Sequence, residues 1–114
     1  MINIKRAYER PDKNDGMRIL VDRLWPRGIT KDSLDIDEWM REIGPSDKLR
    51  KWFNHDPKKW TEFKRKYRLE LEQKKDLLKR MHDISRKQTL TLVYSAKDEI
   101  HNQAVVLKED LEHM

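Results

Sequence analysis

The eight residues Val21-Asp22-Arg23-Leu24-Trp25-Pro26-Arg27-Gly28 are the most informative about the fold, because they mark the end of a buried strand. The apolar run 19–21 that leads into them is typical of a strand covered on both faces, as in parallel sheets. Pro26 fixes its own φ and pushes Trp25 towards extended geometry, and Gly28 permits a backbone conformation closed to other residues. The sequence therefore predicts a strand that ends in a stiff, basic and aromatic loop.

Two more strands follow from the pattern of apolar residues. Ile2 and Ile4 alternate with polar residues, which predicts a short first strand. The strand before the loop covers residues 18–23 and is the second. Residues 89–94 are rich in β-branched and aromatic side chains, and this composition predicts a third strand.

Helices are expected in most of the remaining chain. Apolar positions predict an amphipathic helix from about 33 to 43, and then a short helix that Ser46 caps. A long helix is expected over 57–84, with Asp56 as its cap and Pro57 at its first position. One more helix follows the third strand and is expected to bury four apolar residues, Ile100, Ala104, Leu107 and Leu111.

The order of these elements predicts the fold class. A strand joined to the next through a long helical connection is typical of a parallel pair with a right-handed crossover. We therefore predict a single α/β domain over residues 1–114, with a small, mostly parallel sheet of about three strands covered by about four helices. The direction of the first strand stays open, because its connection to the second is short for a crossover and long for a tight hairpin.

Composition narrows the chemistry and the location. The 114 residues include no cysteine, which excludes disulfides, thiol catalysis, zinc–thiolate sites and iron–sulfur clusters. The chain also lacks an N-terminal apolar signal region and any apolar run of membrane-spanning length, so a cytoplasmic location is expected. The formal net charge of +5 permits an anionic partner, nucleic acid included, but does not require one.

Polar and charged side chains follow two strands that we expect to lie side by side. Arg23 and Arg27 follow the second strand, and Ser95, His101 and Asn102 follow the third. The carboxyl ends of parallel strands share one edge of the sheet, where α/β proteins bind ligands. Arginine binds carboxylate or phosphate with two hydrogen bonds at once, and a helix N-terminus favours anions. The five residues are therefore expected to converge on a site for a small anion.

Structural roles for the same region stay open. Asp22 can pair with a neighbouring arginine while Trp25 fills the core, and Ser95 can simply cap the last helix, in a capping-box spacing with Asp98. A carboxylate beside His55 can raise its basicity, although the same residue, Asp56, suits a helix cap. The histidines show no spacing typical of a zinc site, and no phosphate-binding glycine loop is present, so we expect neither a metal nor a cofactor. These histidines are His55, His82, His101 and His113.

The long helix supports a different hypothesis. Residues 58–80 contain ten Lys or Arg and four Asp or Glu, so the local excess of positive charge exceeds that of the whole chain. Such a helix can follow a phosphate backbone without sequence preference. It can equally be a solvated face with ion pairs at i, i+4 spacing, such as Glu62–Lys66 and Glu70–Lys74.

Four segments together resemble one known family. They are Val-Asp-Arg-Leu-Trp-Pro-Arg-Gly (21–28), Lys-Trp-Phe-Asn-His-Asp-Pro (51–57), the Trp60, Phe63, Tyr67 spacing, and Leu-Val-Tyr-Ser-Ala-Lys-Asp-Glu-Ile-His-Asn (92–102). They resemble the YeaO-like family of uncharacterised bacterial proteins, within a broader domain family of unknown function, over essentially the entire chain.

The resemblance implies a small intracellular α/β domain and no established reaction. It implies that the family pattern is built around Asp22, Arg23, Trp25, Arg27, Gly28, His55, Asp56, His101 and Asn102. Relatives in the broader family carry a Cys-His-Arg triplet near the position of 99–102 here. Because this chain has no cysteine, a thiol mechanism does not transfer to it.

The leading hypothesis is a protein that binds a small anionic ligand at the sheet edge, with a hydrolase or transferase reaction on that ligand left open. The candidate catalytic residues are Asp22, His55 and His101, with His101 as general acid or base. The candidate ligand-binding residues are Arg23, Trp25, Arg27, Gly28, Ser95 and Asn102. The alternatives are a nucleic-acid-binding module that uses the helix over 57–84 and a protein–protein interaction module with exposed tryptophans. The sequence does not specify the oligomeric state.

Overall fold

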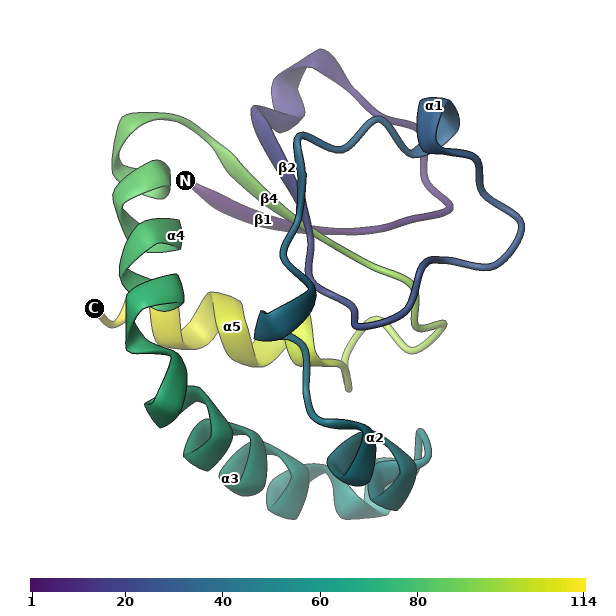
Figure 1. Ribbon diagram of the computed structural model, residues 1–114, viewed down its shortest axis with the longest axis vertical. Helices are drawn as coiled ribbons and strands as arrows, with labels where there is room; N and C mark the ends of the chain where they lie inside the picture. The colour runs from purple at the N-terminus through teal and green to yellow at the C-terminus, as the bar shows by residue number, and fades with distance from the viewer.

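Four parallel strands form the sheet of the computed structural model, which describes residues 1–114 (Figure 1). The order is β1-β4-β2-β3, and the strands are β1 (Ile2–Arg6), β2 (Met17–Leu20), β3 (Glu38–Trp39) and β4 (Leu90–Tyr94). β2 and β4 are adjacent and parallel, with Leu20 opposite Val93, which confirms the prediction from the long helical connection. β1 also runs parallel to β4, and this settles the direction that the sequence left open.

Successive residues of the central strands point to opposite faces of the sheet and so contribute to two apolar clusters. Ile19 and Leu92 belong to the larger cluster, on the face covered by helices, and Leu20 and Val93 belong to a smaller one. The smaller cluster also includes Leu34, and Trp25 and Trp39 pack against it. The sheet is therefore buried on both faces, as the continuous apolar run before the loop predicts.

The helices are α1 (Lys31–Leu34), α2 (Asp47–Phe53), α3 (Trp60–Leu71), α4 (Lys75–Lys87) and α5 (Gln103–Glu112). Figure 1 shows α3 and α4 following one another in an arc, with α5 between this arc and the sheet. No helix combines the length and the apolar composition that crossing a membrane requires. The α/β class with a small parallel sheet is confirmed.

The prediction of a helix from about 33 to 43 is wrong. Only the end of the short α1 and the 3₁₀ turn Arg41–Ile43 are helical there. α1 ends at Asp35 in a left-handed conformation (φ +50°), and the chain between the two pairs with β2 as strand β3. The backbone N–H of Met40 also donates to the carbonyl of Leu20, at 2.9 Å. The edge of β2 needs hydrogen-bond partners, and this tertiary requirement outweighs the helical spacing of the apolar residues.

The helix predicted over 57–84 is interrupted. The side chain of Asp56 accepts a hydrogen bond from the backbone of Lys58 and Pro57 is at the first position, both as predicted, but the first turn is a 3₁₀ turn (Pro57–Lys59). A second 3₁₀ turn, Glu72–Lys74, separates α3 from α4. The break changes the direction of the chain, so that α3 packs against α2 and α5 while α4 reaches β4.

The last helix begins later than predicted. α5 starts at Gln103 and is capped by Asn102, whose side-chain oxygen accepts from two backbone N–H groups, so Ser95 does not cap it. Ile100 lies in the loop before α5 and is 69% exposed, whereas the other three apolar residues of the prediction are buried. The carboxylate of Asp98 accepts the backbone N–H groups of residues 100 and 101 instead, which holds the loop in a turn.

Candidate functional site

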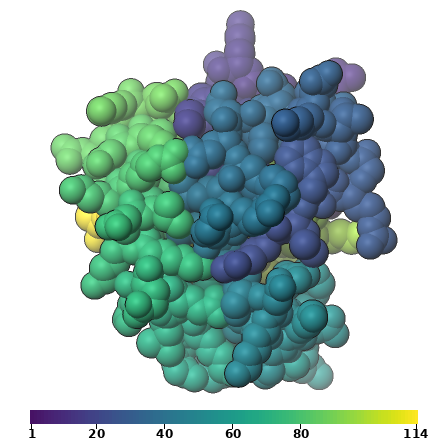
Figure 2. Space-filling model, in the orientation of Figure 1, coloured from purple at the N-terminus to yellow at the C-terminus, as the bar shows by residue number.

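A cavity of about 300 Å³ lies beyond the carboxyl ends of β2 and β4. Its walls are the loop 23–27 on one side and residues of α2 and α3 on the other, and Asp22 and the β4–α5 segment form its floor. In Figure 2 the surface is hollowed where the blue atoms of the loop after β2 meet the teal atoms of α2. Ligands of open α/β sheets bind at this end of the strands, and the volume is at the lower end of the range for small-molecule sites.

The structure brings together eight of the nine residues that the sequence singles out. Those that line the cavity are Asp22, Arg23, Trp25, Arg27, His55, Ser95, His101 and Asn102. Gly28 does not line it. It has a positive φ (+78°), as predicted, so its role is to turn the chain behind the wall.

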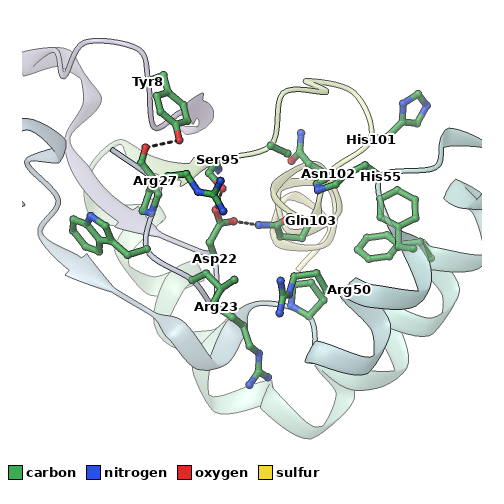
Figure 3. A pocket seen from close by; sticks show the side chains of 17 residues that line it. Tyr8, Asp22, Arg23, Arg27, Arg50, His55, Ser95, His101, Asn102 and Gln103 are labelled. Atoms are coloured by element: carbon green, nitrogen blue, oxygen red, sulfur yellow. Dashed lines mark hydrogen bonds between the residues drawn. The ribbon is translucent and has the colours of Figure 1, made fainter. Parts of the chain in front are cut away.

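Asp22 is the centre of a hydrogen-bond network on the floor (Figure 3). Its carboxylate accepts from the backbone N–H of Ser95, at 2.9 Å, from the Ser95 hydroxyl and from the side-chain amide of Gln103. Burial raises the pKa of Asp22, and the hydrogen bonds from Ser95 and Gln103 oppose this shift. Asp22 pairs with neither of its neighbouring arginines, so the network ties the end of β2 to the start of the β4–α5 segment.

Asn102 and Trp25 also have their polar atoms occupied within the protein. The Asn102 side chain caps α5 and donates to the carbonyl of Asp98, at 3.0 Å. The indole N–H of Trp25 donates to the carbonyl of Ile29, at 2.7 Å, and the ring packs edge-on against Trp39. Trp25 can therefore offer the cavity an apolar surface but no hydrogen bond.

The opposite situation holds for Arg27 and Arg50, which stand on different walls. The guanidinium of exposed Arg27 has no partner in the protein, and only its backbone carbonyl is engaged, by the hydroxyl of Tyr8 at 2.9 Å. The Nε of Arg50 is buried and unpaired, while one terminal nitrogen donates to Asp47, at 2.9 Å. A buried donor without a partner is rare and costly, so the Arg50 Nε lacks an acceptor that water or a ligand can provide.

Arg23 is partly structural. Its Nε donates to the carbonyl of Gly44, at 3.1 Å, and its side chain packs so closely that a Cβ on Gly44 would be 2.9 Å from the Arg23 Cγ. The terminal nitrogens of Arg23 have no acceptor in the protein. The arginine thus joins the loop after β2 to the segment before α2 and keeps part of its donor capacity.

The two histidines of the cavity differ in how they are held. The Nδ1 of His101 is 2.8 Å from a carboxylate oxygen of Asp98, and its ring packs edge-on against Trp60. Hydrogen bonds from the His101 backbone and side chain lower the pKa of Asp98 to about 2. His55 is exposed, has no side-chain partner and adopts a positive φ of +54°. Since Asp56 caps the next turn, it does not orient His55.

Several residues of the cavity were not predicted, namely Tyr8, Arg50, Phe53, Phe63 and Gln103. Phe53 and Phe63 follow the apolar pattern of their helices, and nothing in that pattern shows that they border a cavity. Arg50 comes from a helix that sequence alone does not place at the sheet edge. Gln103 directly follows Asn102, so a correct start for α5 would have drawn attention to it.

The basic helix has fewer free charges than its composition suggests. Arg65 pairs with Glu62, Arg68 pairs with Glu109 and Asp110, and Arg80 pairs with Glu38. None of the four tryptophans is among the exposed large apolar residues; each is partly buried. No group of three or more acidic or imidazole side chains lies close enough together to hold a metal ion.

Comparison with known proteins finds a family model and relatives that cover most of the chain. The family model described as "Inactive DUF488-N3 subclade" matches residues 1–114. The uncharacterised protein YeaO of Escherichia coli (strain K12) is 49% identical over 108 residues, which cover 95% of this chain and 94% of that protein. The uncharacterised protein Rv3073c of Mycobacterium tuberculosis (strain H37Rv) is 33% identical over 108 residues, which cover 95% of this chain and 91% of that protein. No solved structure matches the chain significantly.

Proposed function

The chain belongs to the inactive DUF488-N3 subclade, and we propose that it binds a small anionic molecule in the cavity at the carboxyl edge of its sheet. Arg27 and Arg50 hold the anion from opposite walls. His101 and His55 stand beside the anion, and both become donors when protonated.

The observation that carries the proposal is the division between occupied and free polar groups. The occupied groups, on Asp22, Ser95 and Asn102, hold the floor together. The free groups are guanidinium nitrogens and the His55 ring on the walls and the Nε2 of His101, and no free carboxylate stands among them. Arginine donors without acceptors are suited to phosphate or carboxylate, which accept two hydrogen bonds at once.

The negative charge of Asp22 does not argue against an anion. Its oxygens already accept three hydrogen bonds, and the guanidinium of Arg50 is close enough to lower the pKa that burial raises. The local charge therefore stays positive on the side of the cavity where the arginines lie.

Binding is favoured over a hydrolase or transferase reaction, because the subclade is described as inactive. Nucleic-acid binding through 57–84 is less well supported, since three arginines of that segment already have carboxylate partners. A partner surface of exposed tryptophans lacks support for the reason that all four rings are partly buried.

Calorimetric titration with inorganic phosphate tests the proposal. The variants Arg27→Ala and Arg50→Ala are each expected to weaken phosphate binding about tenfold or more, since a charge-assisted hydrogen bond contributes about 1.5–3 kcal/mol. Arg86→Ala is the matched control, because this exposed arginine of α4 lies outside the cavity and has no partner. Phosphate that does not bind the wild type at tens of millimolar, or that the control loses equally, contradicts the proposal.

A further inference from the structure

The cavity is larger than the anion that its arginines can hold. Its volume of about 300 Å³ is in the range of sites that hold small molecules rather than single ions. A bare phosphate or carboxylate group would fill only the part that the guanidinium groups reach. The rest of the cavity has room for further atoms of a ligand.

Aromatic side chains line that remainder. Phe53 and Phe63 border the cavity and stack on each other, with ring centroids 4.3 Å apart and an interplanar angle of 28°. The stack continues to Trp60, 5.7 Å from Phe63, and Trp60 in turn supports the ring of His101. Leu24 and Pro26 add apolar surface on the opposite wall. These residues give both walls an apolar part, which suits an apolar group of a ligand.

Two further polar groups line the cavity, on Gln103 and His101. The side-chain oxygen of Gln103 accepts no hydrogen bond, because only the amide nitrogen is engaged, with Asp22 and the carbonyl of Val21. The Nε2 of His101 is also free, because Asp98 holds the Nδ1. An acceptor and an imidazole nitrogen in this position can bind hydroxyl groups or ring nitrogens of a ligand.

We propose that the ligand is an aromatic phosphate monoester, such as a nucleoside monophosphate. This inference rests on the proposed anion-binding function and adds the chemical class of the ligand. The phosphate is held by Arg27 and Arg50, and the aromatic ring lies against Phe53 and Phe63. Gln103 and His101 contact polar atoms on the aromatic ring of the ligand or on the group that joins the ring to the phosphate.

A series of matched probes tests the inference with the wild-type protein. The probes are inorganic phosphate, ribose 5-phosphate, adenosine, adenosine 5′-monophosphate and phenyl phosphate, each titrated calorimetrically under the same conditions. Adenosine 5′-monophosphate and phenyl phosphate are expected to bind at least about tenfold more tightly than ribose 5-phosphate, and adenosine much more weakly than its monophosphate. If the nucleotide binds more tightly than phenyl phosphate, the ligand is a nucleotide. If phenyl phosphate binds more tightly, the ligand is a simple aryl phosphate.

Failure of the inference and failure of the proposed function give different results. If ribose 5-phosphate and inorganic phosphate bind as tightly as both aromatic probes, the aromatic claim is overturned while anion binding stands. If no probe binds, the proposed function itself is overturned.

The variant Phe53→Leu gives an independent measurement. It removes one ring of the stack but keeps an apolar side chain, so it is expected to reduce the preference for adenosine 5′-monophosphate over ribose 5-phosphate at least threefold. Its affinity for inorganic phosphate should not change. A preference that stays as in the wild type overturns the assignment of the aromatic end. Because Phe53 is buried, folding of the variant is checked first, and the probe series decides if the variant does not fold.

Discussion

The floor and the walls of the cavity both carry polar side chains, yet they use their polar groups in opposite ways. On the floor, Asp22 and Asn102 have partners for their side-chain oxygens within the protein. On the walls, the Arg27 guanidinium and the Arg50 Nε have none. Proximity to a cavity therefore does not by itself make a residue functional. The free hydrogen-bonding capacity that remains after folding is the more informative property.

Asp22→Ala is expected to have the largest effect. It leaves the Ser95 N–H and the Gln103 amide without acceptors in a mostly buried place, so the free energy of unfolding should fall by about 2–4 kcal/mol. Urea denaturation measures it. Asp83→Ala is the control, because this exposed carboxylate has no partner, and a change within about 0.5 kcal/mol is expected there. If the two variants lose the same stability, Asp22 does not hold the floor.

Asn102→Ala is expected to have the next largest effect on stability. The loss of a cap that accepts from two backbone N–H groups of α5 should cost about 1–2 kcal/mol. The same denaturation series measures this cost. Asn14→Ala, at an exposed position where the side chain makes no hydrogen bond, serves for comparison. A neutral Asn102→Ala would mean that Asn102 is free for a ligand and belongs with the walls.

The two arginines of the loop should differ in their effects on stability. Arg23→Ala removes a hydrogen bond to Gly44 and the packing of the side-chain stem, and is expected to cost about 1 kcal/mol. Arg27→Ala removes no contact of the guanidinium and should change stability by less than about 0.5 kcal/mol. Thermal unfolding of both variants measures the difference. A large loss at Arg27 would move it from the walls to the structural residues.

The pKa values of two aspartates at the site should differ from the ordinary value in opposite directions. Carbon-13 NMR of the carboxyl groups during a pH titration measures both. Asp98 is expected to titrate near pH 2, because hydrogen bonds from His101 and Ile100 stabilise its charged form. Burial raises the pKa of Asp22 above 3.8. Asp98 therefore contributes stability that is present above about pH 4 and is lost as the pH falls towards 2. The contribution of Asp22 has the opposite sign and decreases as the pH rises above 3.8. Similar titration midpoints for both groups would contradict the geometry of the site.

Much of the architecture could be predicted because it depends on local patterns. The apolar run before Asp22 and the β-branched segment at 90–94 each read as buried strands, and their parallel pairing follows from chain connectivity. The convergence of Arg23, Arg27 and the 95–102 segment on one edge follows from that pairing.

The features that could not be predicted depend on competition between elements that lie far apart in the sequence. Residues 38–39 lie in a segment whose apolar residues have helical spacing, but they pair with the open edge of β2 and form a strand. Ser95 suits a cap, yet Asp22, 73 positions away, takes both its N–H and its hydroxyl. The place of Arg50 depends on how α2 packs against α3, which no local pattern specifies.

The division between floor and walls can be tested most directly by NMR of the arginine Nε–H groups during a titration with inorganic phosphate. The Nε–H signals of Arg27 and Arg50 are expected to shift with one common, saturating dissociation constant, because these nitrogens lack acceptors in the free protein. The signal of the Arg23 Nε–H, which already donates to Gly44, should move far less. Signals of Arg27 and Arg50 that stay in place up to tens of millimolar phosphate, or that move no more than the signal of the exposed Arg86, would contradict the account.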